Sequence, residues 1–147
     1  MELIIRKASL NDAAIVASLF DAYRVWYHQE PDLDRARKFL EERLANGDST
    51  VFIAFNNGMP AGFTQLYPIF TSVGMTKAWL LNDLFVHEDH RGLGIASKLL
   101  EKAKELGRLT GSKWLMLQTG FDNTNAQALY QKNGWDKIPD QFYEFIL

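Results

Sequence analysis

The chain has 147 residues, about the length of one ordinary domain, and 47% of them are hydrophobic while 23% are charged. Its net charge of −2 gives no general attraction to nucleic acid or anionic lipid, and the absence of cysteine excludes disulfides, thiolate metal sites and a cysteine nucleophile. No apolar run approaches the roughly 18 residues of a membrane-spanning helix. We therefore expect one cytoplasmic domain, residues 1–147, with no nucleic-acid or membrane partner.

The first half of the chain predicts a strand, two helices and a hairpin. LIIRKA (residues 3–8) is rich in Leu and Ile, as strands are, and apolar residues then recur at helical spacing over residues 15–26 and 33–44. Two β-rich runs flank Asn57-Gly58, a pair typical of hairpin turns. TSVGMTK (residues 71–77) shows no periodic pattern and predicts a mobile loop.

The second half predicts strands that alternate with helices. AWLLNDLFV (residues 78–86) and KWLMLQTG (113–120) are nearly continuous apolar runs, typical of central strands covered on both faces. An amphipathic helix over residues 95–106 connects them, which requires parallel pairing with a right-handed crossover. A short helix (125–133) and a closing strand, QFYEFIL (141–147), follow. The expected fold is α/β, with a mixed, mainly antiparallel sheet of about six to seven strands, a central parallel pair and helices on both faces.

A glycine-bearing turn, RGLGIA (residues 91–96), lies between the first central strand and its helix. The first turn of a helix has unpaired N–H groups and partial positive charge, and glycines with a small Ala96 let an anion approach the backbone. A dinucleotide fingerprint would need glycine where Ser97 stands, and a P-loop would need lysine after Gly94. The turn predicts a phosphate or pyrophosphate site, with a purely geometric turn as the alternative.

A second group of polar residues follows the next central strand. Asn123 and Asn125 precede a helix that places Ala126 and Tyr130 on one face. Alone, this stretch fits helix capping and core packing as well as it fits a site.

Together the two stretches resemble the GNAT (GCN5-related) family of N-acetyltransferases. The first family motif, Arg or Gln, two residues, Gly, one residue, then Gly or Ala, is matched by Arg91, Gly94 and Ala96. The second, Asn…Ala…Leu-Tyr…Gly-aromatic, is similar to a set of downstream residues: Asn123, Ala126, Leu129, Tyr130, Gly134 and Trp135. The resemblance covers essentially the whole chain and implies the acyl-CoA N-acyltransferase fold and an enzyme that uses acetyl-CoA.

The resemblance also implies roles for individual residues. The pyrophosphate of coenzyme A would lie on the N–H groups of the turn, and the pantetheine arm would run between the two central strands. The implied cofactor contacts are Leu84, Phe85, Val86, Arg91, Gly92, Leu93, Gly94, Ile95, Ala96, Asn123, Ala126 and Tyr130. Tyr130 is implied as the general acid that protonates the departing thiolate.

The resemblance is closest in motif to diamine (polyamine) and other small-amine acetyltransferases, because of Asp83-Leu84-Phe85-Val86 before Arg91. Polyamine enzymes carry a glutamate at the position of Asn82, and asparagine cannot accept a proton. Asp83, the polar neighbour of Asn82 in an otherwise apolar strand, either has a structural partner or is the catalytic base through a water chain to the substrate, and both interpretations stay open.

The resemblance also implies that the acceptor amine lies opposite the coenzyme, under the loop that joins the first two helices. The acceptor contacts predicted there combine aromatic, acidic and amide side chains: Trp26, Tyr27, Glu30, Tyr67 and Asn82. The expected reaction is acetylation of a small aliphatic amine or polyamine. The alternatives are acetylation of protein lysines or N-termini, and a non-catalytic acyl-CoA sensor.

No metal is expected, because His28, His87 and His90 have no ligand-type neighbours in the sequence. A homodimer is expected, because members of the family often pair through terminal strands and QFYEFIL is an apolar, edge-capable sequence.

Overall fold

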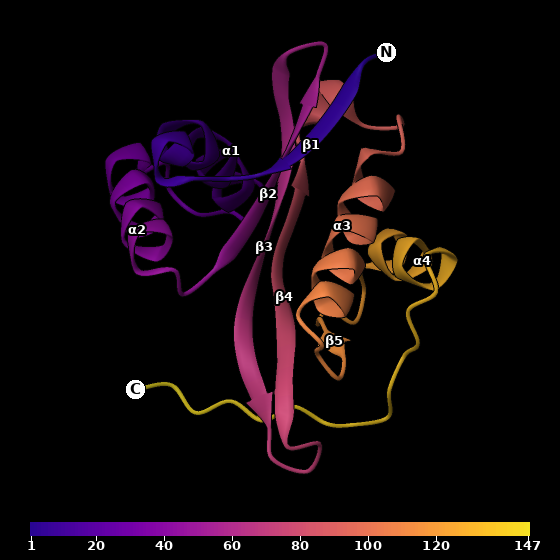
Figure 1. Ribbon diagram of the computed structural model, residues 1–147. Coiled ribbons are helices and arrows are strands. Elements are labelled where there is room, and N and C mark those ends of the chain that lie inside the picture. Colours follow the sequence, from indigo (N-terminus) through magenta and orange to yellow (C-terminus); the bar gives the residue numbers. More distant parts are fainter.

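The helices and strands follow the predicted chain order as far as residue 132, and the computed structural model describes all residues, 1–147 (Figure 1). They are β1 Leu3–Lys7, α1 Ala13–Trp26, α2 Leu33–Asn46, β2 Thr50–Asn56, β3 Met59–Thr71, β4 Thr76–Val86, α3 Ile95–Leu109, β5 Leu115–Met116 and α4 Thr124–Lys132. Short 3-10 turns, Leu10–Asp12 and Glu88–His90, precede α1 and follow β4. None of the helices combines the length and apolar character that crossing a bilayer requires.

One sheet with the strand order β1-β2-β3-β4-β5 forms the centre of the molecule. Its first three pairings are antiparallel, and β4 pairs with β5 in parallel. Helices α1 and α2 cover one face, and α3 and α4 lie on the other (Figure 1). The predicted mixed α/β fold with a parallel pair and helices on both faces is thereby confirmed. The pair was predicted at the centre of the sheet, but it lies at one edge, because no strand follows β5 in the strand order.

The sheet has five strands, so the prediction of six to seven was wrong. The run 113–120 contributes only Leu115–Met116, and these residues are half-buried where full burial was expected. QFYEFIL forms no strand, because no neighbouring strand supplies backbone partners to it. The run 71–77 is a tight turn of residues 72–75 between the ends of β3 and β4, where a mobile loop was predicted.

Two apolar cores hold the layers together, one on each face of the sheet. On the first face, Val16 and Leu40 of the two N-terminal helices pack with Ile53 and Phe63. On the second, Leu99 of α3 packs with buried side chains that include Leu81 of β4. Strand β4 belongs to both cores, because Phe85 packs in the first and Leu81 in the second. Side chains near its centre are therefore close to both sets of helices.

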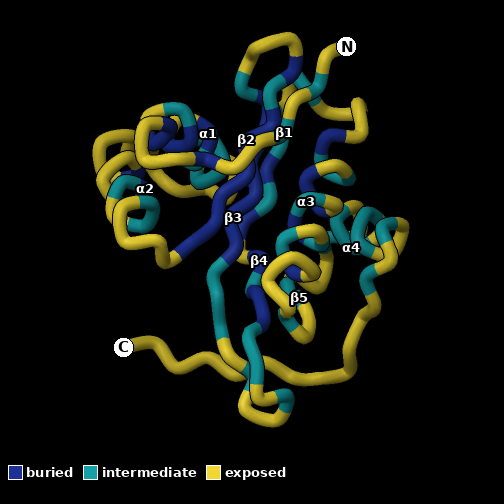
Figure 2. The backbone as a smooth tube through the Cα atoms, in the orientation of Figure 1, coloured by how far each residue is buried: buried dark blue, intermediate teal, exposed yellow.

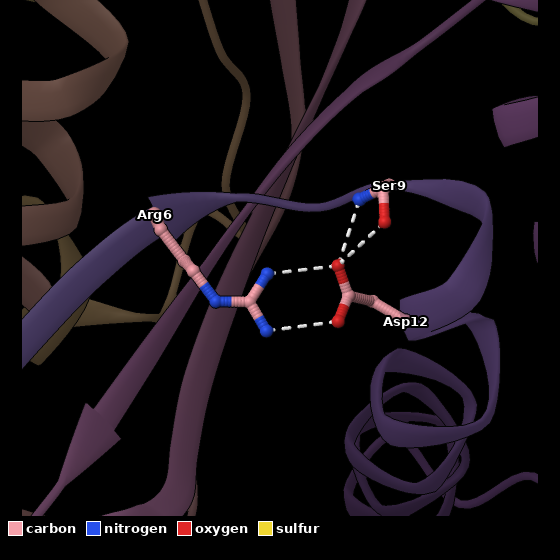
Figure 3. Close-up of polar contacts among 3 residues, drawn as sticks. All are labelled: Arg6, Ser9 and Asp12. Atoms are coloured by element: carbon pink, nitrogen blue, oxygen red, sulfur yellow. Dashed lines mark hydrogen bonds and ion pairs between the residues drawn. The ribbon is translucent and has the colours of Figure 1, made fainter.

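The start of α1 is fixed to the sheet edge by an ion pair between Arg6 and Asp12 (Figure 3). Both terminal nitrogens of Arg6 donate to the Asp12 carboxylate at 2.8 Å, and the backbone N–H of Ser9 donates to the same carboxylate at 2.8 Å. The Arg6 guanidinium is the main cause that holds the pKa of Asp12 well below its usual range. Strand β1 and helix α1 are thus joined by charge as well as by packing.

Candidate active site

The glycine turn presents a continuous row of unpaired backbone donors. Gly92 and Gly94 have φ of 77° and 79°, in the left-handed region that glycine enters without strain. The N–H groups of residues 92–97 donate to no backbone acceptor, and the first hydrogen bond of α3 runs from Lys98 N–H to the Gly94 carbonyl. A Cβ atom at either glycine would meet nothing within 4 Å. The turn is therefore open, and its donors together with the α3 dipole favour an anion.

Arg91 connects this turn to the opposite helix layer. Its Nε donates to the Val86 carbonyl at 2.9 Å, and its guanidinium carbon lies 4.3 Å from the ring centroid of Trp26 at the end of α1. The same guanidinium is 5.8 Å from the Phe85 ring centroid. A positive charge therefore lies beside the unpaired donors of the turn, at the junction of the two faces.

Strand β4 contains a β-bulge at Asn82. Gln65 pairs with Asp83 while Leu66 pairs with Leu81, so Asn82 is left without a partner across the ladder. The bulge changes which face the following side chains meet: Leu81 packs with the α3 core, whereas Asp83 lies on the face of α1. Asn82 is exposed at this point, as bulged residues beside binding sites often are.

Asp83 is a buried carboxylate held by two amides. Gln65 Nε2 donates to its Oδ2 at 2.9 Å and Asn82 Nδ2 donates to its Oδ1 at 3.2 Å. Burial raises the pKa of Asp83, and the two amide hydrogen bonds partly oppose that rise. Burial, and then the charge of Asp83, raises the pKa of the neighbouring Tyr23 phenol.

Tyr130 lies on α4, which begins at a side-chain cap. Asn123 Oδ1 accepts the Ala126 N–H at 3.2 Å and so satisfies one of the free donors of the helix start. The Tyr130 ring lies 6.3 Å from the Trp135 ring, centroid to centroid. Burial, followed by the nearby Tyr27 phenol, raises the pKa of Tyr130. The Tyr130 phenol is accordingly protonated at neutral pH and can donate a proton.

A single cavity of about 380 Å³ brings the two sequence motifs together. Its wall combines residues of α1, β4, the glycine turn, the segment after β5, and α4. Most of the predicted site residues line it: Trp26, Tyr27, Asn82, Leu84, Phe85, Val86, Arg91, Ala96, Asn123, Ala126 and Tyr130.

Other predicted residues lie outside this cavity wall. Gly92, Leu93 and Gly94 belong to the turn beside the cavity, and the Ile95 side chain is buried in the α3 core. Asp83 is buried and is not part of the wall, although its partner Asn82 is. Glu30 and Tyr67 are also not among the lining residues.

The loop between α1 and α2, which contains the predicted acceptor contact Glu30, has a structural role in part. Asp32 caps α2 by accepting the Arg35 N–H at 3.2 Å, and its own N–H donates to Asp21. The Glu30 carbonyl accepts a hydrogen bond from Arg24. No carboxylate lines the cavity.

Several lining residues were not among the predicted contacts, although the last two belong to the second stretch that the sequence singles out: Tyr23, Leu81, Leu117, Gln118, Thr119, Asn125 and Leu129. Tyr23 has the position of an ordinary core residue in the apolar stripe of α1, and its ring does pack against Phe63 and Phe85 at 5.8 Å between centroids. Its phenol nevertheless extends to the cavity and to Asp83. The only signal in the sequence was a polar group on a core-facing stripe.

The geometry thus combines an anion-binding turn, a cavity, a protonated phenol and a bulged strand. No three side chains of His, Cys, Asp or Glu come together as metal ligands would. The arrangement suits a ligand with a phosphate group at the turn and a reacting group between Asn82 and Tyr130.

Comparison with known proteins agrees with this geometry. A family model described as "Acetyltransferase (GNAT) family" matches residues 13–135. The chain is 46% identical, over 133 residues, to a Bacillus subtilis protein named uncharacterized N-acetyltransferase YhfO, covering 90% of this chain and 89% of that one. It is 29% identical to a Haemophilus influenzae protein named as a probable acetyltransferase, with 96% of each chain covered. A crystal structure described as a probable acetyltransferase superposes with a TM-score of 0.88 at 34% identity, covering 100% of this chain and 97% of that one.

Proposed function

Because the chain belongs to the GNAT family of acetyltransferases, we propose that it transfers the acetyl group of acetyl-CoA to the primary amine of a small molecule, with Tyr130 as general acid. The observation that carries this proposal is the shared cavity. Arg91 and Ala96 of the glycine turn, the bulged Asn82 and the Tyr130 phenol all line it. A donor bound at the turn and an acceptor beside Asn82 would therefore meet next to a proton donor.

Acetyl-CoA fits the residues that are present. The free N–H groups of residues 92–97 and the Arg91 guanidinium would bind its pyrophosphate, and Leu84 and Val86 would flank its pantetheine arm. Bound there, it supplies a thioester carbonyl for attack by the amine. To bind the phosphates, Arg91 would give up the hydrogen bond that its Nε now donates to the Val86 carbonyl.

The reaction forms a bond from the amine nitrogen to the acetyl carbon and breaks the bond from that carbon to sulfur. The departing thiolate takes the phenol proton of Tyr130, and the proton that the amine nitrogen loses as the amide forms restores the phenol, so that an amide and a free thiol result. The amine must be neutral to attack, and contact with the half-buried Tyr23 ring in the cavity wall would favour its neutral form. Asp83 is proposed as a positioning residue that orients Asn82 through their 3.2 Å hydrogen bond.

The lining residues support an acceptor with a single amino group more than a polyamine. A second ammonium group would need a carboxylate partner, and none lines the cavity. We therefore propose a small aliphatic monoamine as the preferred acceptor, and polyamines as poorer ones.

An assay of thiol release from acetyl-CoA tests the proposal directly, because the cysteine-free protein adds no thiol of its own. The panel comprises aliphatic monoamines, polyamines, amino acids, aminoglycosides and lysine peptides. We expect amine-dependent thiol release, with the highest kcat/KM for a monoamine. Tight CoA binding without turnover on any amine would favour the acyl-CoA sensor, and turnover of lysine peptides alone would favour protein acetylation.

A further inference from the structure

The exposed part of the glycine turn lies between two fixed points of the chain. On its C-terminal side, Ile95 is 1% exposed and packs in the core that α3 shares with the sheet. On its N-terminal side, the 3-10 turn Glu88–His90 leads from β4 to the glycine turn. Residues 91–94 between them are exposed, in the loop that enters α3 (Figure 2). Because this loop contains two glycines with left-handed backbone, its N–H groups keep one direction only if both ends are held.

The N-terminal side is held by a side-chain hydrogen bond to the sheet. Asn56 Nδ2 lies 3.1 Å from His90 Nδ1. The bond requires the tautomer in which Nδ1 accepts and Nε2 carries the hydrogen. The backbone of Asn56 is itself fixed, because it pairs with Leu3 of β1 on one side and with Met59 of β3 on the other. His90, which directly precedes Arg91, is therefore tied to the antiparallel part of the sheet.

The Asn56 side chain has no other polar partner. The residue is 9% exposed, and its Oδ1 is buried without a hydrogen bond. A buried amide that leaves an atom unpaired costs stability, whereas a leucine of similar size would have no such atom. Residues that break the rules of a fold in this way are concentrated at functional sites. What Asn56 supplies in return is the hydrogen bond to His90.

This bond would become more important when the turn is loaded. The segment 87–94 forms side-chain hydrogen bonds to other elements at two places, from His90 to Asn56 and from Arg91 to the Val86 carbonyl. Arg91 would give up its bond in order to bind the phosphates. The bond between His90 and Asn56 would then be the one that still holds the N-terminal side of the turn.

We propose that Asn56 is a positioning residue for the coenzyme site, which acts through His90 to hold the free N–H groups of the glycine turn in one direction. This role rests on the proposed function, because it concerns the binding of acetyl-CoA. Neither Asn56 nor His90 lines the cavity, so neither contacts the reacting groups. The pair should therefore affect the affinity for CoA and leave the KM for the amine unchanged.

The link is tested first in the free protein, by nitrogen NMR of the His90 ring and of the backbone N–H groups of residues 92–97. In wild type we expect an unprotonated Nδ1 in His90. Asn56→Leu should change both the ring signals and those of residues 92–97. The matched control is Thr110→Val, which removes the 3.0 Å hydrogen bond from Trp79 Nε1 to Thr110 at the other end of α3 and should leave these signals unchanged. Unchanged signals in Asn56→Leu would overturn the proposal.

Calorimetric titration with CoA then measures the effect on the site. Asn56→Leu and His90→Leu should each weaken CoA binding by about 3- to 10-fold, the range that one hydrogen bond accounts for. The double variant should bind CoA as weakly as either single variant, because both substitutions remove the same bond. His90→Asn can place an amide oxygen near the position of Nδ1, so it should keep the wild-type affinity.

The outcomes separate this positioning role from the proposed function. Unchanged affinity in Asn56→Leu, additive losses in the double variant, or a loss in His90→Asn as large as that in His90→Leu would overturn the positioning role alone. An equal loss in Thr110→Val, or an equal rise in the KM for the amine, would also overturn it, because either would indicate a general disturbance. A wild type that binds no CoA would contradict the proposed function and the positioning role together.

Discussion

At the scale of single residues, the site depends on groups whose ionisation is set by burial. The Tyr130 phenol is kept protonated by its surroundings and lines the same cavity as Arg91. Asp83 is a carboxylate with a raised pKa, buried behind the exposed Asn82. The proton donor Tyr130 and the buried carboxylate Asp83 therefore lie on opposite sides of the bulge in β4. The role of each residue can be tested by a separate substitution.

Tyr130→Phe tests the general acid, because it removes the phenol proton and keeps the ring. We expect kcat to fall by about 10- to 100-fold, toward the lower end of usual acid–base contributions, with little change in the KM for acetyl-CoA. The same substitution at Tyr143, which is exposed near the C-terminus, should leave kcat unchanged. An unaltered rate in Tyr130→Phe would remove this residue from the mechanism.

Asp83→Asn tests the buried carboxylate through pH. A raised pKa means that the folded protein keeps a proton which the unfolded chain loses above about pH 4, so this group makes wild-type stability fall as pH rises. The variant does not titrate at this position. The free energy of unfolding is measured in urea for both proteins. The value for the variant, relative to that for wild type, should therefore rise between about pH 4 and pH 7. If the free energies of unfolding of the two proteins change equally with pH, the pKa of Asp83 is not raised in the folded protein.

The same variant also tests the positioning role of Asp83. If the carboxylate orients Asn82, Asp83→Asn should raise the KM for the amine several-fold and leave the KM for acetyl-CoA unchanged, as should Asn82→Ala. A purely structural Asp83 would move neither constant. Equal changes in both constants would indicate a general disturbance of the cavity.

At the scale of elements, the start of α3 is the feature that the sequence predicted best. Its glycines have positive φ and its first donors are free, as the anion-site interpretation requires. Gly94 is the N-cap of α3, and Gly111, just beyond the other end of this helix, also has positive φ with open space around it. The two glycines form a matched pair in which only one lies at the candidate site.

Gly94→Ala and Gly111→Ala exploit this pair. Each should lower the free energy of unfolding by about 1–2 kcal/mol, because a Cβ disfavours left-handed backbone. Only Gly94→Ala should weaken CoA binding, since it displaces the donors of the turn. Calorimetric titration with CoA separates the two effects. Equal weakening in both variants would mean that lost stability alone is responsible.

The elements that the sequence did not predict are those fixed by distant contacts. The β-bulge at Asn82 arises from the pairing of β3 with β4, whereas the apolar run around it suggests an uninterrupted strand. The register of β5 with β4 covers only Leu115 and Met116, and apolar composition alone cannot reveal where such a pairing stops. Tyr23 joins the cavity through the packing of α1 on β4, so its position in an apolar stripe hides its second role.

At the scale of the whole molecule, the cavity lies where the two helix layers meet around the central strand. Residues of α1 line it from one face of the sheet, and residues of α4 and the glycine turn from the other. The position of α1 relative to the sheet therefore affects both stability and the site. Arg6 and Asp12 hold α1 to β1 (Figure 3), and their ion pair should make the stability of the molecule sensitive to acid.

Asp12→Asn tests this prediction. The substitution keeps the shape of the side chain but removes its negative charge, and with it the two charge-assisted hydrogen bonds from Arg6. The free energy of unfolding at pH 7 should therefore fall by about 1–3 kcal/mol. A lowered pKa stabilises the fold above the unfolded value near 3.9 and loses this effect as pH falls below it. The difference between wild type and variant should therefore narrow below about pH 4. The control is Asp48→Asn, which breaks the 2.8 Å ion pair between Asp48 and Arg43. The side chain of Asp48 is 46% exposed, whereas that of Asp12 is 10% exposed. Such an exposed pair contributes about 0–1 kcal/mol, so a larger loss in Asp48→Asn than in Asp12→Asn would contradict the assignment of acid sensitivity to the junction of β1 and α1.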